Sequence, residues 1–168
     1  MTANQSITPF LWFDDKAEEA MKFYVSVFSG SPKKRGDSRI ISIARYEKGM
    51  ESPGIDDMVG KVLTGVFELD GQQFMALDGG PIFKFNEAFS LLIECEDQKE
   101  IDYFWEKLSA VPESEVCGWL KDKYGVSWQI TPKNFTAAMN DPDRKKAIKI
   151  MNAVLKMKKI IIKELESV

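Results

Sequence analysis

The 168-residue sequence contains no histidine. This absence excludes Ser-His-Asp and Cys-His catalysis, zinc sites that use histidine and the iron site of two histidines and a carboxylate. A general base would have to be a carboxylate, lysine, tyrosine or cysteine. Cysteine is also scarce: Cys95 and Cys117 are too few for a disulfide framework. We therefore expect a reducing, cytoplasmic location.

Long apolar runs and an excess of basic residues are missing too. No apolar run approaches the length that crosses a bilayer, and the start MTANQSITPF lacks the basic and apolar segments of a secretory signal. The net charge of −3 argues against a nucleic-acid partner. Residues 141–168 nevertheless hold eight Lys/Arg against four Asp/Glu, so the C-terminal end is locally basic. We expect neither a membrane nor a nucleic acid as partner.

The remaining composition, 44% hydrophobic and 29% charged, is typical of a soluble globular domain. Over residues 7–77 the hydrophobic pattern predicts a strand, an amphipathic helix, a second strand and a hairpin. Asp15 with Glu18 is expected to cap the helix, and the hairpin should turn at Asp70-Gly71.

The same order then repeats in a shorter form. A strand at 89–95, a helix capped by Asp97 and a last strand at 126–131 follow, and Asp141 is expected to cap a further helix. Few residues separate the helix of this second repeat from its last strands, so the middle strand of the repeat must be brief or missing. We predict an α+β fold, a single domain of two βαβββ modules with a C-terminal helical tail. Its parts are module one at 1–80, a linker at 81–86, module two at 87–132 and the tail at 133–168.

Each such module forms a small curved sheet with one helix behind it. The face away from the helix must be filled by side chains, a ligand or a partner chain. Period-two alternation places either Leu11 and Phe13, or Phe10 and Trp12, on that face, and the pattern leaves both open.

Four segments resemble a known family: TPFLWFDDKAEEAMKFYVSVF, LDGQQFMALDGGPIFKFNEAFS, CGWLKDKYGVSWQITP and DPDRKKAIKIMNAVLKMKKIIIKELE. They are similar to the PhnB-like, demethylubiquinone methyltransferase-like branch of the vicinal-oxygen-chelate superfamily, which includes glyoxalase I, extradiol dioxygenases and bleomycin-resistance proteins. The resemblance covers roughly residues 6–166. It implies paired βαβββ modules, usually in a homodimer, and a small-molecule ligand.

The resemblance also implies where a metal would bind. The superfamily holds a divalent ion on one residue at the start of each module's first strand and one in its last strand. In this sequence those positions carry Pro9, Met75, Ser90 and Gln129. These residues are poor or no ligands for a divalent ion, so we expect no metal and no other cofactor.

The methyltransferase label has its own sequence requirement. A Rossmann-type S-adenosylmethionine site needs a strand, a glycine-rich turn and a helix. Asp78-Gly79-Gly80 follows a predicted strand, but Pro81 and the residues after it do not open a helix. The sequence therefore argues against a methyltransferase of that type.

Several side chains are candidates for a ligand pocket, with core or dimer interface as the alternative for the aromatic ones. Gln129 either orients a ligand or is satisfied by Ser90 or water, and Cys117 is either a nucleophile or a small core residue. We predict a metal-independent small-molecule binding protein. The alternatives are an enzyme using the same pocket, with lyase-, isomerase-, oxygenase- or methyltransferase-like chemistry, and a purely structural dimer. The pocket candidates are Trp12, Phe74, Met75, Ser90, Trp119, Trp128 and Gln129.

Overall fold

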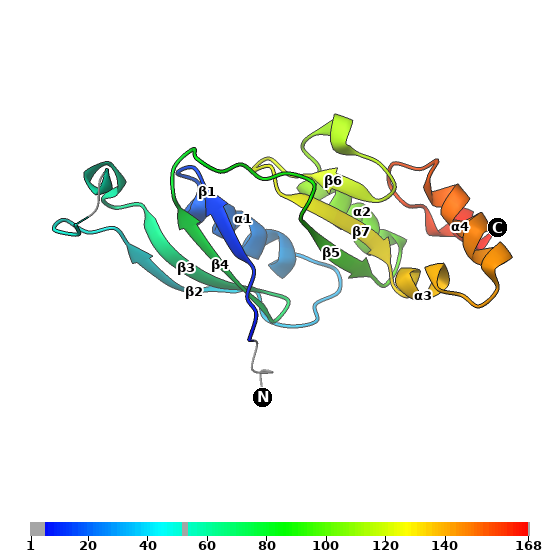
Figure 1. The fold of residues 1–168 in the computed structure, drawn as a ribbon. Coiled ribbons are helices and arrows are strands. Elements are labelled where there is room, and N and C mark those ends of the chain that lie inside the picture. Colours follow the sequence, from blue (N-terminus) through cyan, green and yellow to red (C-terminus); the bar gives the residue numbers. More distant parts are fainter. Residues whose placement is uncertain (1–5, 52–53, 168) are drawn as a thin grey trace. The chain divides into compact units, whose positions relative to one another are not determined.

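The computed structural model describes residues 6–51 and 54–167 and divides into two compact units, Met1–Lys84 and Phe85–Val168 (Figure 1). The ends of the predicted module one and of the predicted tail, at residues 1 and 168, lie outside the described residues. Each unit is a small sheet with helices packed on it. The predicted α+β class is confirmed.

In its described residues, the first unit contains one α-helix, a short 3-10 helix and a four-stranded sheet. Its order is β1-β4-β3-β2, with β1 parallel to β4 and the other neighbours antiparallel. This arrangement confirms the predicted strand, helix, strand and hairpin. The elements are β1 (Phe10–Phe13), α1 (Ala17–Ser29), β2 (Arg39–Arg45), η1 (Ile55–Met58), β3 (Val62–Leu69) and β4 (Gln72–Asp78).

The core of the first unit lies between α1 and the sheet. Leu11 and Phe13 are buried on the helix side, so Phe10 and Trp12 lie on the other face of the sheet. Gly65 in β3 lets Met21 of α1 approach, because a Cβ atom there would lie 2.5 Å from the Met21 sulfur. The buried helix residues are Ala17, Ala20, Met21, Tyr24, Val27 and Phe28.

The start of α1 differs from the prediction. Asp15 does not cap the helix: the N-cap residue is Lys16, and it makes no capping hydrogen bond through its side chain. The buried carboxylate of Asp78, at the end of β4, accepts the N–H of Ala17 at 2.8 Å and that of Val62 at 2.9 Å. The free N–H at the start of α1 is therefore satisfied by Asp78, which is distant in the sequence, and not by the neighbouring Asp15 that the local pattern favours.

The second unit has a three-stranded sheet of order β5-β7-β6, with β5 parallel to β7 and β6 antiparallel to it. Among its described residues, β6 spans only three residues and an isolated bridge joins Val116 to Trp119. The expectation of a shortened middle is confirmed. The elements are β5 (Ser90–Cys95), α2 (Gln98–Leu108), η2 (Pro112–Ser114), β6 (Trp119–Lys121), β7 (Ser127–Pro132), α3 (Phe135–Met139), α4 (Arg144–Val154) and α5 (Ile162–Glu166).

The helix caps of this unit were predicted with mixed success. Asp97 caps α2 as expected, accepting the N–H of Glu100 at 3.0 Å. Asp141 does not cap α4, because Asp143 accepts the first helical N–H groups and the helix begins at Arg144. Asp141 instead accepts the N–H of Asp143 at 2.9 Å in the preceding turn.

The last part of the chain is an integral piece of the second unit. Cys117 donates its N–H to the carbonyl of Met157 at 2.8 Å. Gly118 donates to the carbonyl of Lys158 at the same distance. Ile160 is fully buried and packs against Gly118. No described helix is long and apolar enough to cross a membrane.

Candidate functional site

Each sheet has one face packed on a helix and one face turned away from it, which we call its open face. The open face of the first unit is apolar where β1 meets β4, whereas Glu68 and Gln73 lie farther along the same face. The register pairs Phe10 with Met75 and Trp12 with Leu77, and Val66 lies beside Met75. All five side chains keep part of their surface accessible within this unit.

Trp12 is held in one orientation on this face. Its indole N–H donates to the carbonyl of Gly80 at 2.9 Å, and the Phe83 ring meets it edge-on at 5.0 Å. The indole lies so close to Gly79 that a Cβ atom there would be 2.0 Å from the ring. Glycine is therefore required at this position for Trp12 to lie where it does.

Two of the predicted pocket residues lie in the cores instead. Phe74 is buried on the helix side of β4 and stacks on Phe67, with ring centres 5.5 Å apart. Trp128 is 1% exposed and donates its indole N–H to Asp122 at 2.8 Å. The remaining predicted pocket residues lie on the open faces.

The open face of the second unit is more polar. Gln129 in β7 donates its side-chain amide N–H to the hydroxyl of Ser90 in β5 at 2.8 Å. On the other side of Gln129 the register places Trp119 of β6, and Lys121 follows on the same face. Of the partners considered for the Gln129 side chain (a ligand, Ser90 or water), the structure shows Ser90.

The positions that correspond to the superfamily's metal ligands are neighbours within each unit. The N–H of Met75 donates to the carbonyl of Pro9 at 2.9 Å, and Gln129 donates to Ser90. None of the four carries a charged or imidazole side chain. Across residues 6–51 and 54–167, no three His, Cys, Asp or Glu side chains are grouped in a way that could hold a metal ion.

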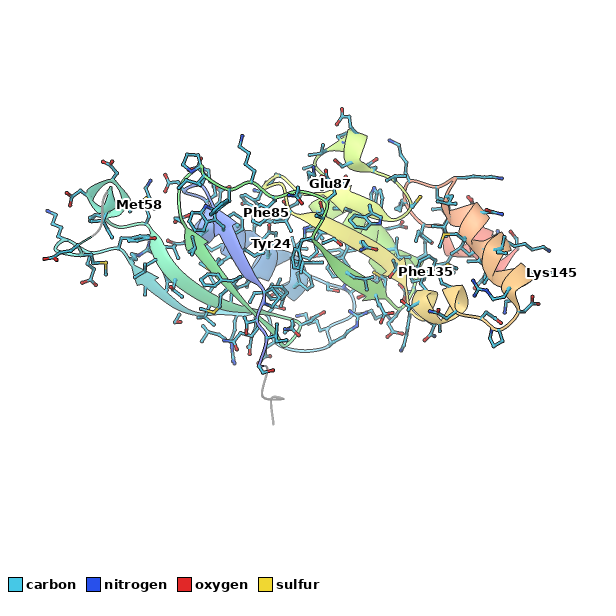
Figure 2. The ribbon with its side chains drawn as sticks, in the orientation of Figure 1. Tyr24, Met58, Phe85, Glu87, Phe135 and Lys145 are labelled. Carbon is cyan, nitrogen blue, oxygen red and sulfur yellow. The ribbon has the colours of Figure 1, made fainter. Side chains whose placement is uncertain are left out.

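Beside β6, the second unit contains an open cavity of about 490 Å³. This volume is within the range of small-molecule sites. The sequence pattern identified Trp119 and drew attention to Cys117, but residues 109–116 show no periodic pattern and Glu87 follows the predicted linker, so the other lining residues were missed. The lining residues are Glu87, Glu113, Ser114, Val116, Cys117 and Trp119; Figure 2 labels Glu87.

The cavity carries carboxylates and no basic side chain. Glu87 is ion-paired with Lys121, and this hydrogen bond holds the pKa of Glu87 below its ordinary value. Glu115 lies between two lining residues, Ser114 and Val116, but does not itself line the cavity. It accepts a hydrogen bond from the Ser109 hydroxyl at 2.7 Å, which lowers the pKa of Glu115, and Lys158 acts in the same direction.

Cys117 is the nucleophile candidate that lines the cavity. Its backbone has φ +54°, a left-handed conformation uncommon outside glycine, and the hydrogen bonds to the tail hold it there. Two lysines that follow Cys117 in the sequence are engaged elsewhere: Lys121 with Glu87, and Lys123 over the ring of Tyr124 at 5.0 Å. Cys95 is fully buried, as expected of a core residue.

Charged side chains of the first unit are engaged within the protein. Arg45 pairs with Glu18 at 2.6 Å and donates to the carbonyl of Gly60, so it belongs to a surface ion pair. Hydrogen bonds from Lys22 and then Arg45 lower the pKa of Glu18. No helix follows the glycine pair after β4 in the described residues, and Asp78 is occupied by backbone donors.

Comparison with known proteins places the chain in a family. The family model described as 3-demethylubiquinone-9 3-methyltransferase matches residues 5–131. The chain belongs to this family. A PhnB protein from Bacillus cereus is 42% identical with a TM-score of 0.59, covering 76% of this chain and 99% of its own. A search of curated proteins found no match.

More distant structures show the fold alone. A protein from Pseudomonas aeruginosa is 18% identical with a TM-score of 0.56, covering 77% of this chain and 98% of its own. The fosfomycin resistance protein FosX from Mesorhizobium loti is 10% identical with a TM-score of 0.52, covering 82% and 98%. The chain is thus a member of the PhnB-like family, and it shares its fold with these more distant structures. The family match ends before the tail.

Proposed function

We propose that this PhnB-like protein binds a small organic molecule without a metal ion, at the open face of the second unit and the cavity beside it. The observation that carries the proposal is the Ser90–Gln129 hydrogen bond, because it places a neutral, paired couple where the superfamily has metal ligands. Trp119 adjoins this couple in the register and also lines the cavity.

The polar couple has hydrogen-bonding capacity to spare. The Gln129 amide retains its carbonyl oxygen and a second N–H after bonding to Ser90. Both side chains are half-buried, so a ligand reaching them meets groups that lose little hydration on binding. The indole of Trp119 supplies an apolar surface next to them, and such a mixture is typical of small-molecule sites.

The methyltransferase activity named in the family description has little support at the glycine-rich segment. A Rossmann-type site needs the turn to lead into a helix whose N-terminus faces the ligand. Here Gly79 packs on Trp12, and the carboxylate of Asp78 is used by backbone groups. A second candidate is an enzyme that works on the same bound molecule, and the thiol of Cys117 at the cavity is the observation that favours it.

Native mass spectrometry combined with metal analysis tests the proposal first. We expect no stoichiometric divalent ion, and the same spectrum tests the homodimer implied by the family. A thermal-shift screen should then find a ligand whose affinity falls about tenfold in Gln129→Leu, through loss of one to two hydrogen bonds. Gln72→Leu, at an exposed site on β4, is the matched control.

Two results contradict the proposal. One is a tightly bound divalent ion in the purified protein. The other is a ligand that the Gln129 variant and the Gln72 variant bind equally well.

A further inference from the structure

We infer that the molecule bound in the cavity is an organic cation, a substituted ammonium group joined to an apolar or aromatic part. The inference rests on the proposed function and adds the chemical class of the ligand. Its basis is the lining of the cavity beside β6, which combines two carboxylates, an indole and an aliphatic side chain with no basic group.

The balance of charge around the cavity is the first argument. Glu87 is compensated by Lys121, and Glu115 behind the wall by Lys158. Glu113 has no hydrogen-bond or ion-pair partner among the described residues, so one carboxylate at the cavity lacks a counter-ion. An anionic ligand would meet this carboxylate without compensation, whereas a cation would neutralise it.

The aromatic wall is the second argument. Trp119 is half-buried and its indole lines the cavity. Indole is the side chain whose face attracts cations most strongly, and the attraction grows as the site loses water. Val116, which is 53% exposed, offers apolar contact for the rest of the ligand.

The tail gives the wall a fixed shape. Residues 113–117 supply four of the six lining side chains. Cys117, at the end of this segment, and Gly118, which follows it, donate their N–H groups to the carbonyls of residues 157 and 158. At the other end, the Lys158 side chain donates to the carbonyl of Pro112 at 3.4 Å. The cavity is thus preorganised by a segment that the family match does not include.

Calorimetric titration with three probes of similar size tests the inference: benzyltrimethylammonium, benzyl alcohol and benzoate. We expect the ammonium to bind about three- to tenfold more tightly than benzyl alcohol, and benzoate to bind most weakly. Glu113→Gln and Trp119→Leu should each weaken the ammonium about threefold or more. Lys121→Met, which releases Glu87 from its ion pair, should strengthen binding of the ammonium probe.

Controls separate this inference from the proposed function. Glu106→Gln, an exposed carboxylate on α2, should leave all three affinities unchanged, and thermal melts check that every variant folds. If benzyl alcohol or benzoate matches the ammonium while Trp119→Leu weakens them, small-molecule binding stands and the charge inference is wrong. Absence of ammonium binding, or binding unaffected by Glu113→Gln, also overturns the charge inference, whereas the proposed function is judged separately by the Gln129 variant.

Discussion

The two units share a strand-helix-strands order but differ in the chemistry of their open faces beside the first strand. In the first unit that part of the face is apolar, with Trp12 held beside Leu77. In the second it carries the Ser90–Gln129 pair, with Lys121 held by Glu87 nearby. The repeat therefore preserves the helix-facing core while the opposite face is free to diverge.

A second contrast concerns how each unit secures its loops. Both rely on a buried aspartate. Asp78 accepts two backbone N–H groups in the first unit. Asp122 in the second accepts the N–H groups of Tyr124 and Val126 and the indole N–H of Trp128. A buried carboxylate without such donors would be very costly, so each aspartate and its donors are stable only as a set.

The largest expected effect comes from removing either carboxylate. Asp122→Ala and Asp78→Ala leave buried donors without an acceptor, and each should lower the free energy of unfolding by about 3–5 kcal/mol. Urea denaturation measures the loss, and Asp56→Ala at an exposed site is the control. A loss below about 1 kcal/mol would show that water replaces the carboxylate.

A smaller effect tests the polar pair of the second face. Ser90→Ala leaves the half-buried Gln129 amide unpaired and should cost about 0.5–1.5 kcal/mol of unfolding free energy. Replacing both, Ser90→Ala with Gln129→Leu, should be nearly neutral because no polar group is then stranded. Urea denaturation of the three variants completes a double-mutant cycle. Additive losses would mean that the two side chains do not depend on each other.

The smallest expected effect is a pH dependence of the free energy that holds the tail to the rest of the second unit. Lys159 lowers the pKa of Asp102, and Ser109 followed by Lys158 lowers that of Glu115. Because both pKa values are lower in the folded state, their stabilisation is present above the ordinary values of 3.8 and 4.5 and is lost as the pH falls below them.

Hydrogen exchange measures how far the tail loosens when this stabilisation is lost. The amides of Cys117 and Gly118, corrected for intrinsic rates, should exchange faster below about pH 4, by an amount equivalent to about 0.2–1 kcal/mol for each exposed ion pair. Amides in the middle of β4 should not change. Equal acceleration in both places would indicate unfolding of the whole chain rather than release of the tail.

The sequence was informative about elements whose signal is local. Alternation in β1 and β4, the 3.6-residue period of α1 and the cap at Asp97 all appear where the pattern predicts them. Asp15 was misjudged because the donor at the start of α1 is satisfied by Asp78, more than sixty residues away. Asp141 was misjudged because Asp143 competes for the same donors.

The candidate site was less predictable for a related reason. Period-two alternation could not choose a face for β1, and only the packing of α1 places Trp12 on the open one. The cavity wall at 113–117 has no repeating pattern, and it depends on hydrogen bonds from the tail. Glu87 and Glu113 lie on segments brought together by the fold, and single-sequence periodicity does not record that proximity.

The contact between Gly118 and the tail makes the local structure at residue 118 depend on a segment forty residues farther along the chain. A side chain at Gly118 would meet Ile160 at 2.9 Å and the carbonyl of Ile130 at 3.0 Å, in a left-handed backbone that already favours glycine. Truncating the chain before residue 157 would leave the N–H groups of Cys117 and Gly118 without their acceptors, the carbonyls of residues 157 and 158, and expose the surface on which Ile160 packs.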